Sequence, residues 1–448
     1  MSTIKKGAII TTEIVDMDHK GDGIGRVGST VVFIKGAVIG DKVKAVAKTT
    51  AAKKNYFTAE LIEIEELSPL RKTQWEVCPH KAEGCGGCKL SELEYTAQAD
   101  LKVKQLTETL KRIGRIEEPE VKSIIEADHI YNYRNKAVLS QDNGKVGFLA
   151  GRSNRVIDCE TCQINADETM AVARAVRRYI AANPDAGKRI KQILVRLGEV
   201  DETGEREVQI GILDKAKTFD PIIELAEEIA EDVNLVSFYW AKDADKWRHV
   251  AGKTTINCRI GEKRYEVSPG AFFQINDEQV LKLYDKVKEY AGLTGEEVIL
   301  DAYCGVGTIG LHLADKAKYI VGIEKVRAAI LDANRNATIN GVVNARYFVG
   351  TSESTLSQLY AGHRNDFELE KIDVAIVDPP RAGCAWPLID TLVQRRVKKI
   401  IYVSCDPATL ARDVAILQEN GYTFKECTPV DMFPQCNNIE TVALLSRA

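Results

Sequence analysis

Two features of this 448-residue chain consist of cysteines whose neighbours in the sequence favour a catalytic or metal-binding role. One is a single thiol, Cys405, in the stretch Tyr402–Pro407, which follows the apolar pair Ile400–Ile401. The pattern predicts a buried strand, a sharp turn and a helix with Pro407 in its first turn. Cys405 would then lie at the carboxyl end of a strand, where open α/β sheets bind ligands, and the helix N-terminus favours a thiolate. Because most lone cysteines are simply buried apolar residues, a nucleophile needs support from other positions.

The other group is Cys78, Cys85 and Cys88, which lie within eleven residues of one another. The glycines between the last two allow a tight fold around one point, so the spacing indicates a metal site. A fourth ligand must come from elsewhere, and Cys159 and Cys162 are the candidates. Four thiolates fit either zinc or an iron–sulfur cluster, and the spacing does not choose between them. A redox Cys-x-x-Cys pair is the weaker alternative, because it leaves Cys78 unexplained.

A glycine-rich turn supplies a third feature. The apolar run that ends in Asp301 leads into Gly305-x-Gly307-x-x-Gly310, and a second run, residues 319–323, ends in Glu324. Such glycines let a ligand approach the backbone, and the acid can take ribose hydroxyls, so a nucleotide-type site is expected. The motif also fits a NAD enzyme. Asp301 before the glycines, and a later run that ends in Asp378, favour S-adenosylmethionine.

Alternating buried strands and helices from about residue 268 must position these groups. The run 372–377 is followed by Asp378, two prolines and Arg381, and the prolines fix a stiff corner at the end of a strand. In a parallel sheet that corner faces the same crevice as Cys405. This part of the chain is therefore predicted to be a Rossmann-like α/β domain.

Residues 7–66 show short alternating runs separated by glycine and charged turns, including a turn cluster at residues 18–25. They predict a five-stranded barrel of the oligonucleotide-binding type, which presents a face to single strands. Residues 1–58 hold ten Lys and Arg against five Asp and Glu, and that surplus permits a polyanionic partner. A structural barrel without a ligand is the competing interpretation.

Residues 130–270 read as an α+β segment. Between Tyr131 and Arg155, five basic residues face one acidic residue and aromatic residues are interleaved. That mixture suits contact with phosphates and stacking on bases, although an ordinary polar hairpin has the same pattern. Apolar residues at helical spacing predict a helix from Leu90 to about Ile113, which could pack on the C-terminal domain.

The composition is that of a globular chain, with 45% hydrophobic and 28% charged residues and a net charge of −4. No apolar run approaches the roughly 20 residues of a membrane span, and the first residues lack a signal-peptide core. A cytoplasmic protein without a membrane partner is expected. Eleven irregularly spaced cysteines argue against a disulfide framework.

Together these motifs resemble, over essentially the full length, the RNA uracil-5-methyltransferases that carry an N-terminal TRAM domain and a [4Fe–4S] cluster. The chain is close in these motifs to the bacterial members that modify 23S ribosomal RNA. It rests on residues 273–276, 301–307, 378–383 and 404–407, and on Asp431–Pro434 leading to Glu440. The resemblance implies that Cys405 is the nucleophile and Glu440 the base. The implied cofactor-pocket residues are Gln274, Tyr303, Glu324 and Asp378, and the implied cluster ligands are Cys78, Cys85, Cys88 and Cys162.

The expected enzyme has three parts: a TRAM or OB-fold barrel (1–66), a central α+β domain with the cluster and RNA contacts (67–267), and a methyltransferase domain (268–448). It would act as a monomer and use S-adenosylmethionine to methylate carbon 5 of a uridine in 23S ribosomal RNA. The thiol would add to carbon 6 of uracil, which makes carbon 5 nucleophilic, and the base would then remove the carbon 5 proton. Three alternatives are open: a tRNA uracil-5-methyltransferase, an RNA cytosine-5-methyltransferase, and an RNA-binding iron–sulfur protein without catalysis.

Overall fold

The computed structural model describes residues 4–49, 55–73, 77–216, 219–243, 246–363, 367 and 369–447. Its contacts divide the chain into two compact units. The N-terminal unit comprises Met1–Gln105 and Phe433–Asn437, and the C-terminal unit comprises Leu106–Met432 and Asn438–Ala448. The three-part division at residues 66 and 267 stays a prediction. Within the described ranges, no helix combines the length and the apolar character that crossing a bilayer requires.

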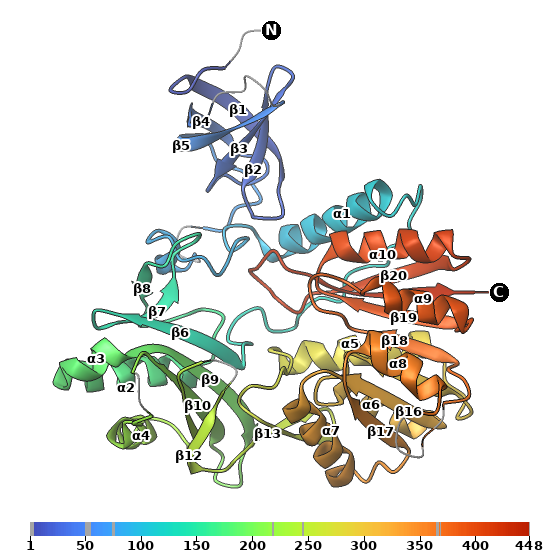
Figure 1. Ribbon diagram of the computed structural model, residues 1–448. Helices are drawn as coiled ribbons and strands as arrows, with labels where there is room; N and C mark the ends of the chain where they lie inside the picture. The colour runs from blue at the N-terminus through green and yellow to red at the C-terminus, as the bar shows by residue number, and fades with distance from the viewer. Residues whose placement is uncertain are drawn as a thin grey trace. The chain divides into compact units, whose positions relative to one another are not determined.

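The N-terminal unit contains a closed five-stranded barrel with the strand order β1-β2-β3-β5-β4 (Figure 1). Its strands are β1 (Ile9–Met17), β2 (Gly23–Val27), β3 (Thr30–Lys35), β4 (Lys42–Ala47) and β5 (Tyr56–Glu66). Buried and exposed residues alternate along β1, as they must in a strand with one face on a core. Val32, Ile34 and Phe57 are among the fully buried side chains inside the barrel. The predicted barrel is therefore confirmed.

The turn predicted over residues 18–25 is shorter than expected, because β2 already begins at Gly23. A Cβ atom on Gly23 would lie 2.7 Å from the carbonyl oxygen of Ala37. A Cβ on Gly25 would lie 2.7 Å from the Thr12 methyl group. These glycines permit close packing inside a strand, whereas the sequence pattern suggested that they break one.

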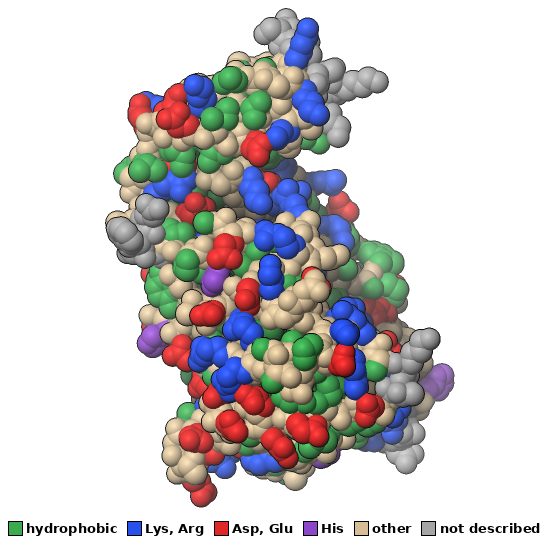
Figure 2. All heavy atoms as spheres, turned by 90° about the vertical axis from the view of Figure 1, so that its left-hand side faces the viewer, with side chains coloured by type: hydrophobic (Ala, Val, Ile, Leu, Met, Phe, Trp, Pro, Cys, Tyr) green, Lys and Arg blue, Asp and Glu red, His purple; other side chains and the backbone are tan. Residues whose placement is uncertain are grey.

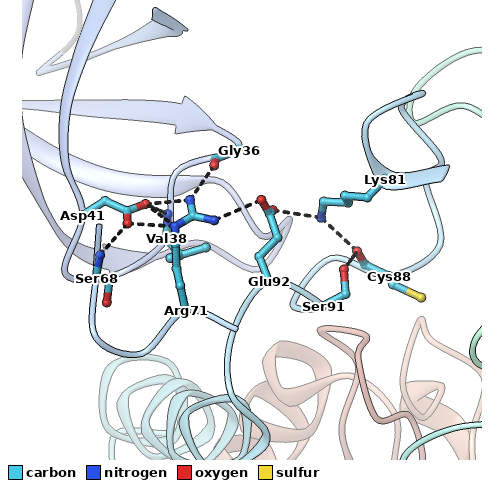
Figure 3. Close-up of polar contacts among 9 residues, drawn as sticks. All are labelled: Gly36, Val38, Asp41, Ser68, Arg71, Lys81, Cys88, Ser91 and Glu92. Carbon is cyan, nitrogen blue, oxygen red and sulfur yellow. Dashed lines mark hydrogen bonds and ion pairs between the residues drawn. The ribbon is translucent and has the colours of Figure 1, made fainter. Parts of the chain in front are cut away.

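A chain of ion pairs links the barrel to the cysteine loop of the same unit (Figure 3). Arg71 donates to the buried carboxylate of Asp41, with Nη2 at 2.7 Å and Nε at 2.9 Å, and its Nη1 lies 3.1 Å from Glu92. Glu92 also pairs with Lys81 at 3.3 Å, and Lys81 Nζ donates to the backbone oxygen of Cys88 at 3.0 Å. The loop carrying the cysteines is thus held by charge-assisted hydrogen bonds.

Two helical elements complete the N-terminal unit: η2 (Pro79–Lys81) and the first part of α1 (Tyr95–Arg112). The segment Phe433–Asn437 joins this unit through the buried side chain of Gln435. Gln98 Nε2 and Lys72 Nζ donate to Gln435 Oε1 at 3.0 and 2.9 Å.

The C-terminal unit contains two seven-stranded sheets, and the first has the order β12-β11-β10-β9-β6-β7-β8 (Figure 1). Its strands are β6 (Lys136–Asp142), β7 (Lys145–Leu149), β8 (Val156–Asp158), β9 (Ile190–Val200), β10 (Arg206–Asp214), β11 (Leu235–Ala241) and β12 (Arg248–Gly252). Helices α2 (Asp167–Ala182), α3 (Pro184–Arg189) and α4 (Ile223–Ala230) accompany it, and the hairpin β13 (Ile256–Ile260) and β14 (Lys263–Val267) follows. The predicted α+β character is confirmed.

The second sheet has the order β17-β16-β15-β18-β19-β21-β20. Its strands are β15 (Val298–Ala302), β16 (Tyr319–Glu324), β17 (Ala345–Val349), β18 (Val374–Val377), β19 (Lys399–Ser404), β20 (Thr423–Val430) and β21 (Glu440–Ser446). The helical elements are α5 (Asp277–Ala291), α6 (Thr308–Leu313), η3 (Ala314–Lys316), α7 (Arg327–Ile339), α8 (Ser352–Tyr360), α9 (Trp386–Gln394) and α10 (Pro407–Glu419). Strands β15 to β19 are parallel, and β21 is antiparallel to its neighbours.

Strand order reverses between β15 and β18, which places a topological switch point at their carboxyl ends. The predicted Rossmann-like fold is therefore confirmed. Leu106 and Leu110 of α1 are fully buried in the core of this sheet, as expected from the helical pattern. Sequence and structure agree that ligands should bind at the switch point.

Candidate active site

The thiol of Cys405 lies at the turn between β19 and α10. Ser404 ends the strand, and Pro407 begins the helix. Asp406 caps that helix, because its Oδ1 accepts hydrogen bonds from the N–H groups of Ala408 and Thr409 at 2.9 and 3.1 Å. The predicted strand, turn and helix are all present, and they leave the Cys405 side chain half-buried.

Glu440 begins β21 and is 4% exposed. Strand β21 pairs antiparallel with β19, and Thr441 lies opposite Ser404. The next residues outward along the two strands are Glu440 and Cys405. The pairing therefore brings the predicted nucleophile and the predicted base to the same edge of the sheet.

The electrostatics of Cys405 differ from the sequence-based expectation of a thiolate. Burial, and after it the charges of Glu440 and Asp378, raise the pKa of Cys405 to about 11, whereas Arg381 opposes them. Burial and nearby carboxylates thus outweigh the helix N-terminus. The raised pKa of Cys405 differs from the expectation that the helix N-terminus favours a thiolate.

The same acidic surroundings act on Glu440. Burial, and secondly the charge of Asp378, raise the pKa of Glu440 well above its ordinary value, and Arg381 lowers it. Asp378 directly follows β18, and burial together with Asp301 raises the pKa of Asp378 to about 7. Perturbed acids gathered in a crevice are typical of functional sites.

The glycine-rich turn after β15 has an unusual backbone. Tyr303, Gly305 and Gly307 have φ values of +64°, +55° and +84°, and no atom lies within 4 Å of a Cβ built on Gly305. Asp301 accepts a hydrogen bond from Gly310 N at 2.8 Å through Oδ2. Its Oδ1 is buried and has no partner among the described residues. An open turn beside an unpaired carboxylate oxygen fits a polar ligand with hydroxyl or amino donors.

A narrow pocket opens at this turn. Its lining residues are Phe272, Phe273, Gln274, Tyr284, Tyr303, Cys304, Gly305, Val306, Thr308, Ile309 and Asp378. Three of the four predicted cofactor residues thus line one pocket: Gln274, Tyr303 and Asp378. Glu324 does not line it; it ends β16, where its Oε1 accepts from Val326 N at 2.8 Å, and its charge acts on Asp301.

Two features of the site were missed in the sequence. Tyr284 of α5 and Thr308 of α6 share a hydrogen bond of 2.8 Å at its wall, and no local pattern joins these two positions. Arg381 is the second feature, because its charge favours the ionised forms of both Cys405 and Glu440. Its position directly after two prolines at a strand end was the signal that could have identified it.

The four cysteines predicted as cluster ligands fall in different units. Cys78, Cys85 and Cys88 are half-buried in the loop around η2, and Cys162 is half-buried in the C-terminal unit, where Asn165 Nδ2 donates to its sulfur at 3.1 Å. Cys159, the other candidate, is 1% exposed and donates its S–H to Ile157 O. No group of three or more His, Cys, Asp or Glu in the described ranges is arranged to hold a metal ion. The ligand set stays a prediction.

Comparisons with known proteins cover both units. The sequence profile of the tRNA (uracil-5-)-methyltransferase family matches residues 94–448, and the TRAM-domain profile matches residues 5–62. An uncharacterized RNA methyltransferase of Halalkalibacterium halodurans is 35% identical over 462 positions, which cover 99% of this chain and 98% of that protein. One from Clostridium acetobutylicum is 35% identical over 469 positions, with the same coverage of 99% and 98%.

A solved structure is similar over nearly the whole chain. It is the Pyrococcus abyssi tRNA (uracil-54, C5)-methyltransferase in complex with S-adenosyl-L-homocysteine, with a TM-score of 0.75 and 26% sequence identity. The match covers 97% of this chain and 100% of that one.

Proposed function

The chain belongs to the tRNA (uracil-5-)-methyltransferase family, and from that premise we propose that it methylates carbon 5 of a specific uridine in 23S ribosomal RNA through a covalent adduct with Cys405. It is an RNA (uracil-5-)-methyltransferase, and S-adenosylmethionine is its methyl donor. The observation that carries the adduct mechanism is the pairing of β19 with β21, which puts Cys405 and Glu440 at one sheet edge beside Asp378.

The cofactor fits the narrow pocket by its chemistry. The open backbone at Gly305 and the unpaired Oδ1 of Asp301 can accept and surround a nucleoside with its amino and hydroxyl donors. Gln274 and Tyr303 supply further polar groups at the pocket wall. When bound, S-adenosylmethionine supplies a methyl group on an electrophilic sulfonium.

Cys405 makes uracil reactive. Its proton leaves to solvent, its sulfur forms a bond to carbon 6, and the electron pair of the 5,6 double bond moves toward carbon 5 and oxygen 4. Carbon 5 then takes the methyl group. Bonding the sulfur to carbon removes the negative charge that would otherwise face Glu440, and the Glu440 carboxyl then ionises more readily.

Glu440 completes the reaction. Its carboxylate takes the proton from carbon 5, the 5,6 double bond re-forms, and the bond between carbon 6 and sulfur breaks to release the thiolate. Arg381 stabilises the negative charges of this site, because it lowers the pKa of both groups. In the free protein burial is the main cause that raises the pKa of both groups, and the charge of Asp378 adds to it.

The choice of ribosomal RNA rests on the TRAM barrel and on the cysteine set, which accompany the ribosomal enzymes that the chain resembles. A tRNA uridine is the second candidate, because the similar Pyrococcus abyssi enzyme acts on tRNA. Mapping 5-methyluridine in both RNAs from a deletion strain separates the two. Loss of one ribosomal 5-methyluridine with tRNA unchanged supports the proposal, and loss from tRNA alone rejects the ribosomal assignment.

We also propose that Cys78, Cys85, Cys88 and Cys162 hold a [4Fe–4S] cluster. The support is the donor set, since four thiolates are the usual ligands of such a cluster and the three cysteines of one loop lie within eleven residues. Zinc has the same preference for thiolates, so metal analysis must decide between them. No step of the methyl transfer is assigned to the cluster.

A further inference from the structure

Three cations meet at the end of the first sheet of the C-terminal unit. Lys136 on β6 lies directly opposite Arg196 on β9, so the two side chains lie on the same face of the sheet. Arg134 is two residues before Lys136, and its Nε donates to the Lys136 carbonyl oxygen at 3.1 Å. None of the three forms an ion pair within the part of the chain that the structure describes. Like charges directly opposite one another destabilise a sheet.

Arg196 is the deepest member, and it is 2% exposed. Its Nη2 donates to the carbonyl oxygen of Ala271 at 2.5 Å, whereas Nε and Nη1 are buried without a partner among the described residues. A guanidinium cannot shed its proton in a protein, so these donors remain charged and unsatisfied. Asp332 acts on Arg196 only at longer range, because its carboxylate is bonded to Ser268 and Arg335.

Lys136 is half-buried, and burial together with the charges of Arg196 and Arg134 lowers its pKa to about 7. If the side chain at position 136 only had to fill space in the core, an apolar residue would serve there. Unsatisfied charge kept in one place is typical of functional sites, where stability is given up for binding. An anion is the kind of ligand that such unpaired cationic donors would bind.

The cation trio is next to the methyl-transfer pocket. Asn135, between Arg134 and Lys136, donates from its backbone to Ile275 O at 2.9 Å and from its side chain to Gln274 O at 3.0 Å. Gln274 lines the pocket. Arg196 itself bonds to the carbonyl oxygen of Ala271, and the next residue, Phe272, also lines the pocket, so a ligand on the trio would lie near the pocket.

We propose that Arg134, Lys136 and Arg196 form an oxyanion site that binds a phosphodiester group of the RNA next to the target uridine. Arg134 and Lys136, both half-buried, form the accessible mouth, and Arg196 forms the floor. A phosphodiester offers two charged oxygens and two weaker ester oxygens to the two guanidinium groups and the ammonium, whereas a cofactor carboxylate offers only two oxygens. Figure 2 shows Lys and Arg interspersed with Asp and Glu on the face that it views.

The test uses full-length protein and a short fluorescein-labelled oligouridylate, with binding measured over a series of NaCl concentrations. Lys136→Met should weaken binding about three- to tenfold and reduce the slope of log K against log salt by about 0.7, the value for one lost phosphate contact on a single strand. Its melting temperature should be unchanged or higher, because a buried unpaired cation is removed. Affinity for S-adenosylhomocysteine, measured by calorimetry, should stay at the parent value.

Lys316→Met is the matched control, since Lys316 is an exposed lysine of η3 outside the trio, and it should leave affinity and slope unchanged. Arg134→Met repeats the test at a second position if Lys136→Met does not fold. The proposal would be overturned if both variants bound the oligouridylate with the same affinity and the same salt slope as the parent protein. A loss of S-adenosylhomocysteine binding with RNA binding intact would also overturn it, because the site would then bind the cofactor carboxylate. A lowered melting temperature that accounts for the weaker RNA binding would overturn it as well.

Discussion

Ser404 on β19 lies opposite Thr441 on β21, and this single cross-strand pair aligns the ends of two strands that are far apart in the sequence. Because the strands are antiparallel, the residue after Ser404 and the residue before Thr441 reach the same edge of the sheet. Those residues are Cys405 and Glu440. After burial, the charge of Glu440 is the largest cause of the raised pKa of the Cys405 thiol.

The reactivity of Cys405 in the free protein should be low and should rise with pH. Its pKa of about 11 leaves far less thiolate at pH 8 than an ordinary cysteine has. The rate of alkylation by iodoacetamide, followed at this peptide by mass spectrometry, should increase across pH 8 to 10 without a plateau. Arg381→Gln should slow it further, because Arg381 favours the thiolate, and the control Arg395→Gln should not. A plateau near pH 7 would contradict this description.

Asp301 should make the free protein less stable as pH rises. Burial raises the pKa of Asp301 to about 7, above its value in the unfolded chain, so the folded state binds the extra proton and loses stability between about pH 4 and pH 7. Asp301→Asn removes the charge and can still accept from Gly310. We expect it to gain about 2–4 kcal/mol at pH 8 and to bind S-adenosylmethionine at least tenfold more weakly.

Thermal melts at pH 5 and pH 8 measure the stability of the parent and of Asp301→Asn, and calorimetric titration measures their affinity for S-adenosylmethionine. The difference in melting temperature between the two pH values should be smaller in Asp301→Asn than in the parent. An unchanged difference would mean that Asp301 is not the titrating group.

Arg71 should be essential to the stability of the N-terminal unit. Removing it in Arg71→Met leaves the fully buried Asp41 without its cation, which costs about 3–5 kcal/mol. Hydrogen exchange of β1 and β4 should accelerate. The double variant with Asp41→Asn should recover part of the loss, and Lys42→Met, which breaks an exposed pair with Glu66, should change little. Equal effects of Arg71→Met and Lys42→Met would contradict the prediction.

The metal proposal predicts a brown protein with about four irons per chain after purification without oxygen. Cys88→Ala should lose the iron, whereas Cys159→Ala should keep it, because the Cys159 thiol is buried and bonded to Ile157 O. Elemental analysis and the visible absorption spectrum provide the readout. A colourless protein with stoichiometric zinc would reject the cluster.

Much of this site could be predicted because its signals are local. The apolar run before Cys405 and the proline after it define a strand, a turn and a helix, and the glycines after Asp301 define the cofactor turn. Long-range pairing could not be read in the same way. Nothing near Lys136 in the sequence indicates that Arg196 lies opposite it. The raised pKa of Cys405 could not be predicted for a similar reason, because burial of the thiol and the nearby acids, which lie on distant strands, both depend on long-range packing.

The adduct mechanism is tested most directly with the variant Glu440→Gln. It should form the bond between Cys405 and carbon 6 and accept the methyl group, but it cannot remove the carbon 5 proton, so turnover should fall about 10²–10⁴-fold. Incubation with substrate RNA and S-adenosylmethionine, followed by digestion and tandem mass spectrometry, should find a methylated uridine attached to the Cys405 peptide. Cys405→Ala with Glu440→Gln should give none. A Cys405 peptide free of RNA, or RNA attached at another cysteine, would contradict the proposed mechanism.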